Sequence, residues 1–321
     1  MEIRADCENP SEYADDADRD GFADQIAAQI TREKGSSCAP FGPRKNEFNN
    51  VNTRAIFFPF DLFGNSGSKA GVELLADAFQ EMLADNKRER IATRARVYAN
   101  KVRFEEYSFG TLADYANWRD VARARIRQVL RQSEFLFWIS GNHLGALPLY
   151  DELPRDTLVI QLDAHLDIYN LSDCTTELSH GNFLLHVEQP LPRIVNLGQR
   201  ELLLRLEYIQ KYYHANFSAA ELAVDEPGVL GKVRAMCAEA ERVFIDLDCD
   251  AFDAAFFPAT AQPRPFGLAP SFLLRVLDAI DPEKLAGFAI SEFDPARDQH
   301  DRCLETLMWL MEYVLLLRHD R

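Results

Sequence analysis

The sequence predicts an α/β fold in which a mostly parallel central sheet is covered by helices on both faces. Short apolar runs such as AIFFPF (55–60) lack polar alternation, which is typical of strands buried on both faces. Longer amphipathic stretches alternate regularly with these runs, as helices and strands do in parallel sheets. The chain has 321 residues, 47% hydrophobic and 27% charged, which is enough for one domain with a large core.

Each expected strand is one of the short apolar runs, and each expected helix is one of the longer amphipathic stretches. In chain order the strands are AIFFPF (55–60), EFLFWIS (134–140), TLVIQL (157–162), RIVNL (193–197), RVFIDL (242–247) and AGFAIS (286–291). The helices are expected near residues 70–86, 112–132, 200–212, 229–240, 270–280 and 300–318. Together these elements predict a single folded domain over residues 51–321.

The first fifty residues differ in composition from this domain. Residues 1–20 carry eight acids and two arginines, and residues 35–50 are rich in turn-forming residues. A short helix is expected around 21–33 between them. We therefore expect residues 1–50 to form an acidic, partly flexible N-terminal extension.

Net charge excludes some classes of partner. The chain has 51 acidic and 35 basic residues, a net charge of −16, whereas a phosphate backbone requires clustered Lys and Arg. We therefore expect no nucleic-acid partner. A membrane partner is not expected either, because no run of about 18 apolar residues and no apolar secretion signal is found.

The cysteines indicate a reducing compartment. They are scattered, with no CxxC pair, which is typical of reduced thiols in a cytoplasmic protein. The six are Cys7, Cys38, Cys174, Cys237, Cys249 and Cys303.

Acidic and imidazole side chains follow four of the expected strands. In parallel α/β sheets, ligands bind beyond the carboxyl ends of the strands, so these side chains are expected to meet. A single DxD or a single histidine at such a place is usually structural, but recurrence at four strand ends is not. The segments are Gly141-Asn-His143, Asp163-Ala-His165-Leu-Asp167, Asp248-Cys-Asp250-Ala-Phe-Asp253 and Glu292-Phe-Asp-Pro295.

This combination of side chains indicates a metal site. Carboxylates gathered in a cleft repel one another and are costly to desolvate unless cations neutralise them. Oxygen and imidazole ligands without thiolate suit Mn²⁺, with Fe²⁺, Co²⁺, Ni²⁺ or Zn²⁺ as substitutes.

The motifs resemble those of the ureohydrolases, the family of arginase and agmatinase. Asp163-Ala-His165-Leu-Asp167 resembles the family's DAHxD motif, and the segment from Asp248 to Thr260 resembles DxDxxDPxxxPGT. Three shorter elements also match: Ser179-His180-Gly181 resembles SHG, Glu292-Phe-Asp-Pro295 resembles ExxP, and Ser140-Gly-Asn-His143 resembles GGDH. The resemblance covers about residues 55–318.

The resemblance implies a three-layer α/β/α arginase-like fold with two Mn²⁺ ions per subunit. In it, Asp163 and Asp248 bridge the ions. One ion is held by His143, Asp163, Asp167 and Asp248, and the other by Asp163, His165, Asp248 and Asp250. Asp253 is expected to orient a ligand or the following turn.

The activity implied is hydrolysis of a guanidino group to urea and an amine. The expected substrate is an arginine side chain, free or within a peptide, which would give ornithine. A water activated by the metals attacks the guanidinium carbon, His180 returns a proton to the leaving amine, and Glu292 binds the cationic guanidinium. Asp163 belongs to the catalytic set because it bridges the ions.

Several residues depart from the family pattern. Asn142 replaces the aspartate of GGDH. Tyr169 and Thr176 stand where arginase has an Asn and a Ser that bind the substrate's α-carboxylate, and with Glu201 and Glu292 they are the residues expected to bind the substrate here. Leu203 stands where an aspartate would hold the α-amino group, although Glu201 retains an acid nearby. These changes disfavour a free amino acid, because each unmatched charge must be desolvated.

Other functions remain open. Agmatine or another guanidinoalkane has no α-carboxylate to bind. A metal-dependent deacetylase-like amidohydrolase would use one zinc, whereas His143, Asp167 and Asp250 supply ligands for a second ion. A non-catalytic binding protein is a further alternative, disfavoured by the retained ligands. The resemblance also leaves a homo-oligomer open, because the C-terminal stretch CLETLMWLMEYVLLLR is apolar enough for a subunit contact.

Overall fold

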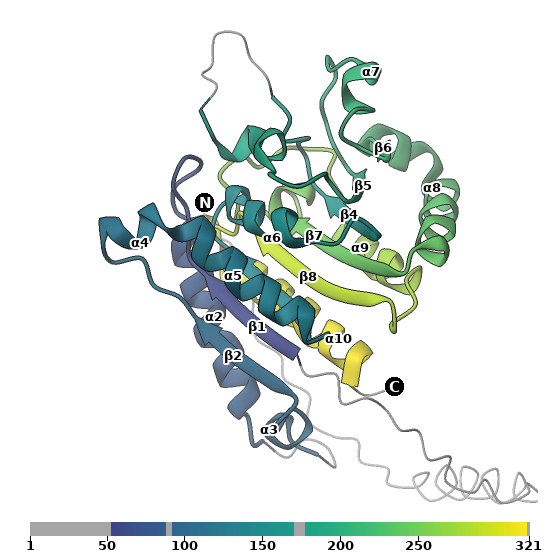
Figure 1. The fold of residues 1–321 in the computed structure, drawn as a ribbon. Coiled ribbons are helices and arrows are strands. Elements are labelled where there is room, and N and C mark those ends of the chain that lie inside the picture. The colour runs from purple at the N-terminus through teal and green to yellow at the C-terminus, as the bar shows by residue number, and fades with distance from the viewer. Residues whose placement is uncertain (1–52, 88–91, 170–176, 320–321) are drawn as a thin grey trace, which may run out of the picture. The chain divides into compact units, whose positions relative to one another are not determined.

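The computed structural model describes residues 53–87, 92–169 and 177–319 of the chain (Figure 1). The expected N-terminal extension, including the helix at 21–33, lies outside the described residues. Within them, eight strands form one sheet in the order β2-β1-β3-β8-β7-β4-β5-β6, and every neighbouring pair is parallel. This confirms the expected sheet, which is wholly rather than mostly parallel.

Apolar runs form the central strands, as expected. These strands are β1 (Thr53–Phe58), β3 (Phe135–Ser140), β4 (Thr157–Leu162), β5 (Arg193–Leu197), β7 (Arg242–Asp248) and β8 (Leu285–Ser291). Side chains alternate between the two faces of each strand. In β3, Phe137 joins the core on one face, and Leu136 and Trp138 join the core on the other.

Helices cover both faces and give three layers (Figure 1). One face of the sheet shares its core with α2 (Ser68–Ala84), α8 (Ala219–Glu239), α9 (Pro270–Asp278) and α10 (Arg302–His319). The other face is covered by α5 (Trp118–Arg131) and α6 (Leu147–Glu152). Shorter helices are α3 (Arg94–Val97), α4 (Leu112–Ala116) and α7 (Leu206–Ile209). No helix in the described ranges is long and apolar enough to cross a membrane.

Two expectations about helices were wrong. The helix expected over 200–212 is only the single turn of α7, because Leu202 and Leu203, apolar residues that such a helix would bury, are more than nine-tenths exposed. The helix expected over 112–132 is divided into α4 and α5 at Asn117, whose φ of −110° and ψ of 10° are not helical.

Two edge strands, β2 (Val102–Glu106) and β6 (Ala215–Phe217), were not expected from the sequence. Neither has a fully buried residue, so neither carries the apolar run that marks the central strands. Their pairing to β1 and β5 is a property of the folded sheet.

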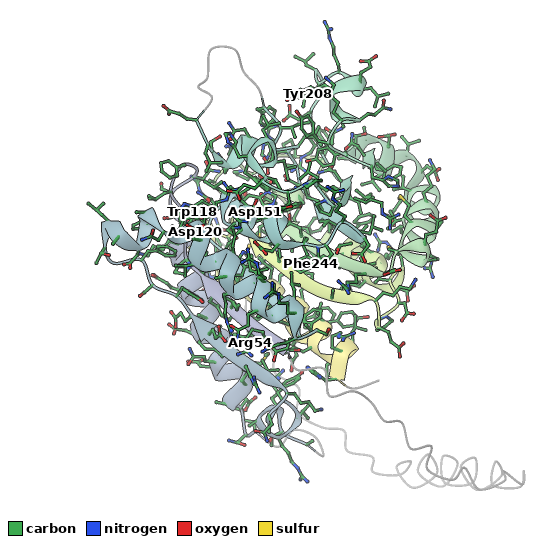
Figure 2. The ribbon with its side chains drawn as sticks, in the orientation of Figure 1. Arg54, Trp118, Asp120, Asp151, Tyr208 and Phe244 are labelled. Carbon is green, nitrogen blue, oxygen red and sulfur yellow. The ribbon has the colours of Figure 1, made fainter. Side chains whose placement is uncertain are left out.

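Ion pairs link neighbouring elements, and Figure 2 labels one member of each, Arg54 and Asp151. Arg54 on β1 pairs with Glu134 at 2.9 Å and with Glu105 on β2 at 2.6 Å. Arg119 on α5 donates two hydrogen bonds to the fully buried carboxylate of Asp151 on α6, at 2.8 and 2.9 Å. These pairs join β1 to β2 and to the residue before β3, and α5 to α6.

Candidate metal centre

The carboxyl ends of β3, β8, β7 and β4 lie side by side in the middle of the sheet. The chain leaves β3 through Gly141, where a Cβ atom would lie 2.2 Å from the carbonyl oxygen of Phe60. Gly141 also accepts a hydrogen bond from the backbone N–H of Glu292, at 2.7 Å. Backbone contacts alone therefore hold the loops after β1, β3 and β8 together.

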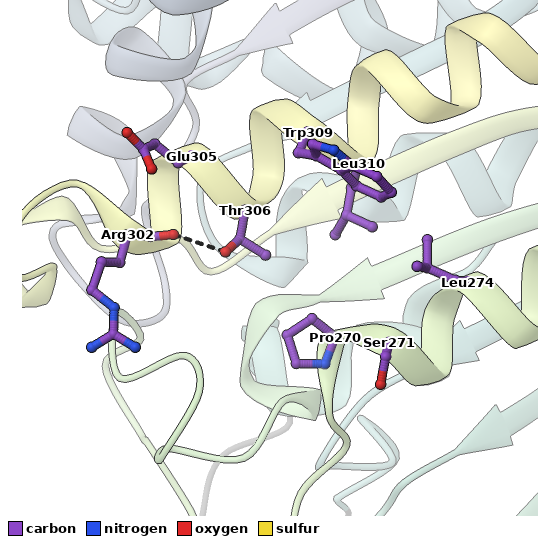
Figure 3. Close-up of a pocket in the computed structure, with 8 residues that line it drawn as sticks. All are labelled: Pro270, Ser271, Leu274, Arg302, Glu305, Thr306, Trp309 and Leu310. Carbon is purple, nitrogen blue, oxygen red and sulfur yellow. Dashed lines mark hydrogen bonds between the residues drawn. The ribbon is translucent and has the colours of Figure 1, made fainter. Parts of the chain in front are cut away.

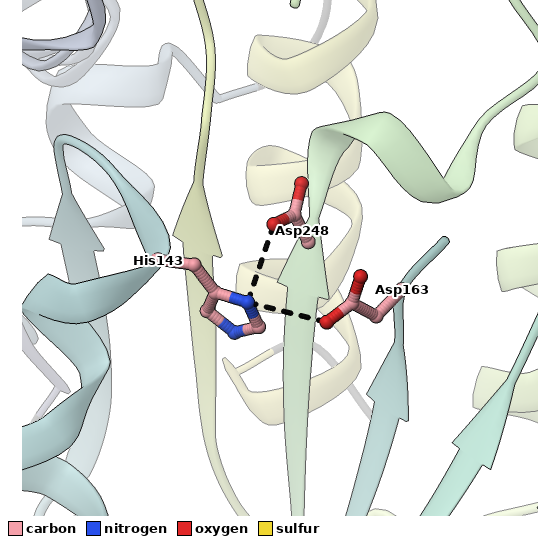
Figure 4. Close-up of side chains that lie close together, drawn as sticks. All are labelled: His143, Asp163 and Asp248. Carbon is pink, nitrogen blue, oxygen red and sulfur yellow. Dashed lines mark ion pairs between the residues drawn. The ribbon is translucent and has the colours of Figure 1, made fainter. Parts of the chain in front are cut away.

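Two groups of ligand-type side chains meet at this edge. His143, Asp163 and Asp248 form one group, drawn in Figure 4, and Asp163, His165 and Asp250 form the other. Within each group the ligand atoms all lie within 4.8 Å of one another. Asp163 belongs to both, as a bridging ligand would.

The first group converges on the Nδ1 atom of His143. That atom lies 3.2 Å from Asp163 Oδ2, 2.8 Å from Asp167 Oδ2 and 3.2 Å from Asp248 Oδ2. In the second group, His165 Nδ1 lies 3.0 Å from Asp250 Oδ2. All six side chains expected as ligands are thus brought together.

The donor set fits a cation. Among the described residues, His143 Nδ1, Asp163 Oδ2 and Asp167 Oδ2 are buried and make no hydrogen bond, although both oxygens lie at ion-pair distance from the nitrogen. Buried polar atoms in native structures rarely lack a hydrogen bond without a reason. A divalent ion between these atoms would satisfy all three.

The pKa values of the clustered side chains also indicate a cation-binding site. Burial, reinforced by Asp167, raises the pKa of Asp163 to about 7. Burial and the Asp250 carboxylate raise the pKa of Asp248 well above its ordinary value. Burial acts to lower the pKa of His165, but Asp250 outweighs it and raises that pKa to about 9. Burial and mutual repulsion thus favour proton binding by these groups, and a cation that binds them must displace those protons.

Asp246, which was not predicted from the sequence, contacts the ring nitrogen of His143 that does not face the other ligands. His143 Nε2 lies 3.0 Å from Asp246 Oδ2, and that oxygen accepts a hydrogen bond from the Tyr150 hydroxyl at 2.7 Å. All three side chains are buried. A carboxylate on one ring nitrogen keeps the proton there and leaves the other nitrogen free to bind a metal. The sequence feature that could have revealed Asp246 is an acidic residue inside an otherwise apolar strand, two residues before Asp248.

His180 and Glu292 lie beside the cluster and contact each other. His180 Nδ1 lies 3.2 Å from Glu292 Oε1, which also accepts the backbone N–H of His143 at 3.0 Å. Glu292 is 3% exposed and has a φ of 63°, a left-handed conformation that is strained for glutamate and typical of functional sites. The pKa of His180 is raised because the Glu292 carboxylate outweighs the lowering effect of burial.

A cleft of about 380 Å³ opens onto the cluster. Besides ligand residues it is lined by His180 and by two residues expected to bind substrate, Tyr169 and Glu201. It is also lined by Gln262 and Arg264, which the sequence analysis missed although they follow the Asp248–Thr260 motif directly. Thr176 lies outside the described residues.

Asp253, Asn142 and Leu203 support or border the site. Asp253 accepts the backbone N–H groups of Ala255 and Gly267 at 2.8 and 2.9 Å and so holds the turn after β7. Asn142 donates to the carbonyl of Leu62 at 3.0 Å and leaves His143 in place. Leu203 is 95% exposed.

A separate hollow of about 500 Å³ lies between α9 and α10 (Figure 3). Helix residues such as Leu274, Thr306 and Trp309 line it. None of the six expected metal ligands lines it.

Comparison with known proteins agrees with this geometry. The arginase family model matches residues 53–317. The agmatinase of Proteus mirabilis is 24% identical over 61% of this chain and 62% of its own length, so the match spans less than two thirds of that relative. The formimidoylglutamase of Staphylococcus aureus (strain JH9) is 23% identical over 78% of this chain and 80% of its own. The agmatine ureohydrolase structure of Thermoplasma volcanium superposes with a TM-score of 0.67 at 19% identity, covering 90% of this chain and 97% of that one.

Proposed function

We propose that this chain, which belongs to the arginase family, is a hydrolase of carbon–nitrogen bonds in linear amidines and cleaves a guanidino group to urea and an amine. One observation carries the proposal: buried nitrogen and oxygen atoms of His143, Asp163 and Asp167 that make no hydrogen bond meet within 3.2 Å of His143 Nδ1, beside a cleft that His143 and Asp167 line.

We propose two Mn²⁺ ions as the cofactor. His143, Asp163, Asp167 and Asp248 would hold one, and Asp163, His165, Asp248 and Asp250 the other. Carboxylate and imidazole donors without thiolate support manganese. When bound, such a pair of ions activates a water molecule near neutral pH as the nucleophile.

His180 is the proposed proton donor. Its side chain is 26% exposed and lines the cleft, so a leaving amine nitrogen can reach its ring. The Glu292 carboxylate orients the ring through Nδ1 and stabilises its protonated form. The other imidazole nitrogen, Nε2, would then pass its proton to the amine.

Glu292 is also the proposed partner of the substrate guanidinium. Its carboxylate is almost fully buried and is held by the backbone of His143 and, at 3.3 Å, by the side chain of Asn65. A cationic guanidinium beside His180 would pair with this carboxylate through charge-assisted hydrogen bonds. The proposed substrate is an arginine side chain, free or within a peptide.

Agmatine is the second candidate, supported by the relatives named agmatinase. The test is urea release by manganese-loaded protein from agmatine, free arginine and an arginine peptide with blocked ends. Urea from any of the three supports the proposed chemistry, and omission of manganese should abolish it. No urea from all three would contradict it, and release of acetate from acetylated amines would favour the deacetylase alternative instead.

A further inference from the structure

The cleft has one guanidinium of its own, and the proposed function does not use it. Arg264 lines the cleft together with His143, His165 and other ligand residues. Its Nη1 lies 3.3 Å from Oε1 of Glu201, which lines the same cleft. A positive and a negative side chain therefore stand together at the wall of a site proposed to bind a cation.

Arg264 makes too few contacts for a purely structural role. A guanidinium has five N–H donors, and the hydrogen bond to Glu201 is the only one that the Arg264 side chain makes to described residues. The side chain is 40% exposed. Arg200 offers a contrast: its guanidinium is bonded to the backbone carbonyls of Gly198, Asp250 and Ala251 and so fastens two loops. The other donors of Arg264 have no partner among the described residues, and the side chain lines the cleft.

Electrostatics then discriminates between substrates. Agmatine carries a guanidinium and an ammonium but no carboxylate, so it offers no acceptor to the remaining donors of Arg264. An amino acid carries a carboxylate as well, which can take the free donors of Arg264 in a forked, charge-assisted pair. Its ammonium is matched by Glu201. Arg264 and Glu201 thus complement the two charges of an amino-acid head group, its carboxylate and its ammonium.

Tyr169 adds a third polar group beside this pair. Its hydroxyl is buried and has no hydrogen-bond partner among the described residues. A carboxylate in the cleft would give this hydroxyl an acceptor.

We propose that Arg264 and Glu201 form a subsite for the head of a free α-amino acid, with the carboxylate on Arg264 and the ammonium on Glu201. The inference rests on the proposed function and narrows its substrate to an amino acid with a terminal guanidino group. It also replaces the α-group contacts whose loss at Tyr169 and Leu203 disfavoured free arginine in the sequence.

The test compares arginine with argininamide, which differ only in that the carboxylate becomes a neutral amide. The wild-type protein should have the higher kcat/KM for arginine. Arg264→Gln should lower the arginine-to-argininamide ratio of kcat/KM about 10- to 100-fold, the usual range for a hydrogen bond to a charged group. Arg264→Lys should retain part of the preference because it keeps the charge but loses the fork.

Controls separate this subsite from folding and from the chemistry. Arg234→Gln removes an arginine that is 61% exposed and paired with Asp278, and should leave the ratio unchanged. Circular dichroism and manganese content should match the wild type in every variant. Inhibition by ornithine, compared with putrescine, reports the same preference without turnover of a guanidine.

The outcomes distinguish the two levels of the proposal. Equal use of arginine and argininamide by the wild type, or an equal loss for both in Arg264→Gln, would overturn the subsite while leaving the ureohydrolase activity intact. A preference for a blocked arginine peptide over free arginine would do the same. No urea from any guanidine would overturn the proposed function itself.

Discussion

Asp246 sets the orientation of a proposed metal ligand from inside the core. Its contact with His143 Nε2, supported by Tyr150, keeps His143 Nδ1 directed at the carboxylates of Asp163 and Asp167. We predict that Asp246→Asn lowers manganese affinity about 10- to 100-fold, because the amide can hold the ring in the wrong tautomer. Calorimetric titration of metal-free protein with Mn²⁺ measures this. Asp278→Asn, at a carboxylate that is 74% exposed, is the matched control; equal affinities in the two variants would contradict the role of Asp246.

His180 pairs with Glu292 and belongs to neither group of metal-ligand side chains. We predict that His180→Ala binds as much manganese as the wild type but releases urea about 10²- to 10⁴-fold more slowly, because the leaving amine loses its proton donor. Metal analysis and a urea assay on one sample test both parts. Unchanged turnover would remove His180 from the mechanism.

Which site residues can be predicted from the sequence depends on how far away in the chain their partners lie. The six ligands could be predicted because each is an acid or histidine next to a buried strand. Asp246, Tyr150 and Arg264 could not, because each acquires its role from a partner that lies 63 to 103 residues away. Only the fold brings those partners together.

Among the elements, α5 and α6 are joined by a buried carboxylate. Asp151 accepts two hydrogen bonds from Arg119 and one from the backbone of Glu188 at 2.9 Å. We predict that Asp151→Ala lowers the free energy of unfolding by about 3 kcal/mol, since Arg119 loses its partner in a mostly buried place. Asp120→Ala, at the exposed first turn of α5, should cost less than about 1 kcal/mol. Urea unfolding of both variants tests this, and similar midpoints would contradict it.

Burial decided which elements could be predicted. The six central strands are apolar on both faces, so their sequences alone reveal them. The edge strands β2 and β6 have no fully buried residue and depend on pairing with a neighbour. Leu202 and Leu203 led to a wrong prediction of a helix over 200–212. An apolar pair predicts burial, yet both residues are exposed in the loop after β5.

Over the whole molecule, the metal cluster makes stability depend on pH. Asp163 and His165 have pKa values of about 7 and 9, above their ordinary values. The folded metal-free protein therefore binds more protons than the unfolded chain between about pH 4 and 9, and these two groups lose their stabilising contribution as the pH rises. We predict that manganese raises the Tm more at pH 8.5 than at pH 5.5. Thermal unfolding with and without Mn²⁺ tests this; a larger gain at pH 5.5 would contradict it.

We propose that Asp163 joins two metal ions in one catalytic site. Manganese ions per chain and urea formed can be counted on the same samples of wild-type protein and Asp163→Ala. We expect about two ions and manganese-dependent urea for the wild type, and loss of both in the variant. One ion or none in an active wild type, or full activity in Asp163→Ala, would contradict it.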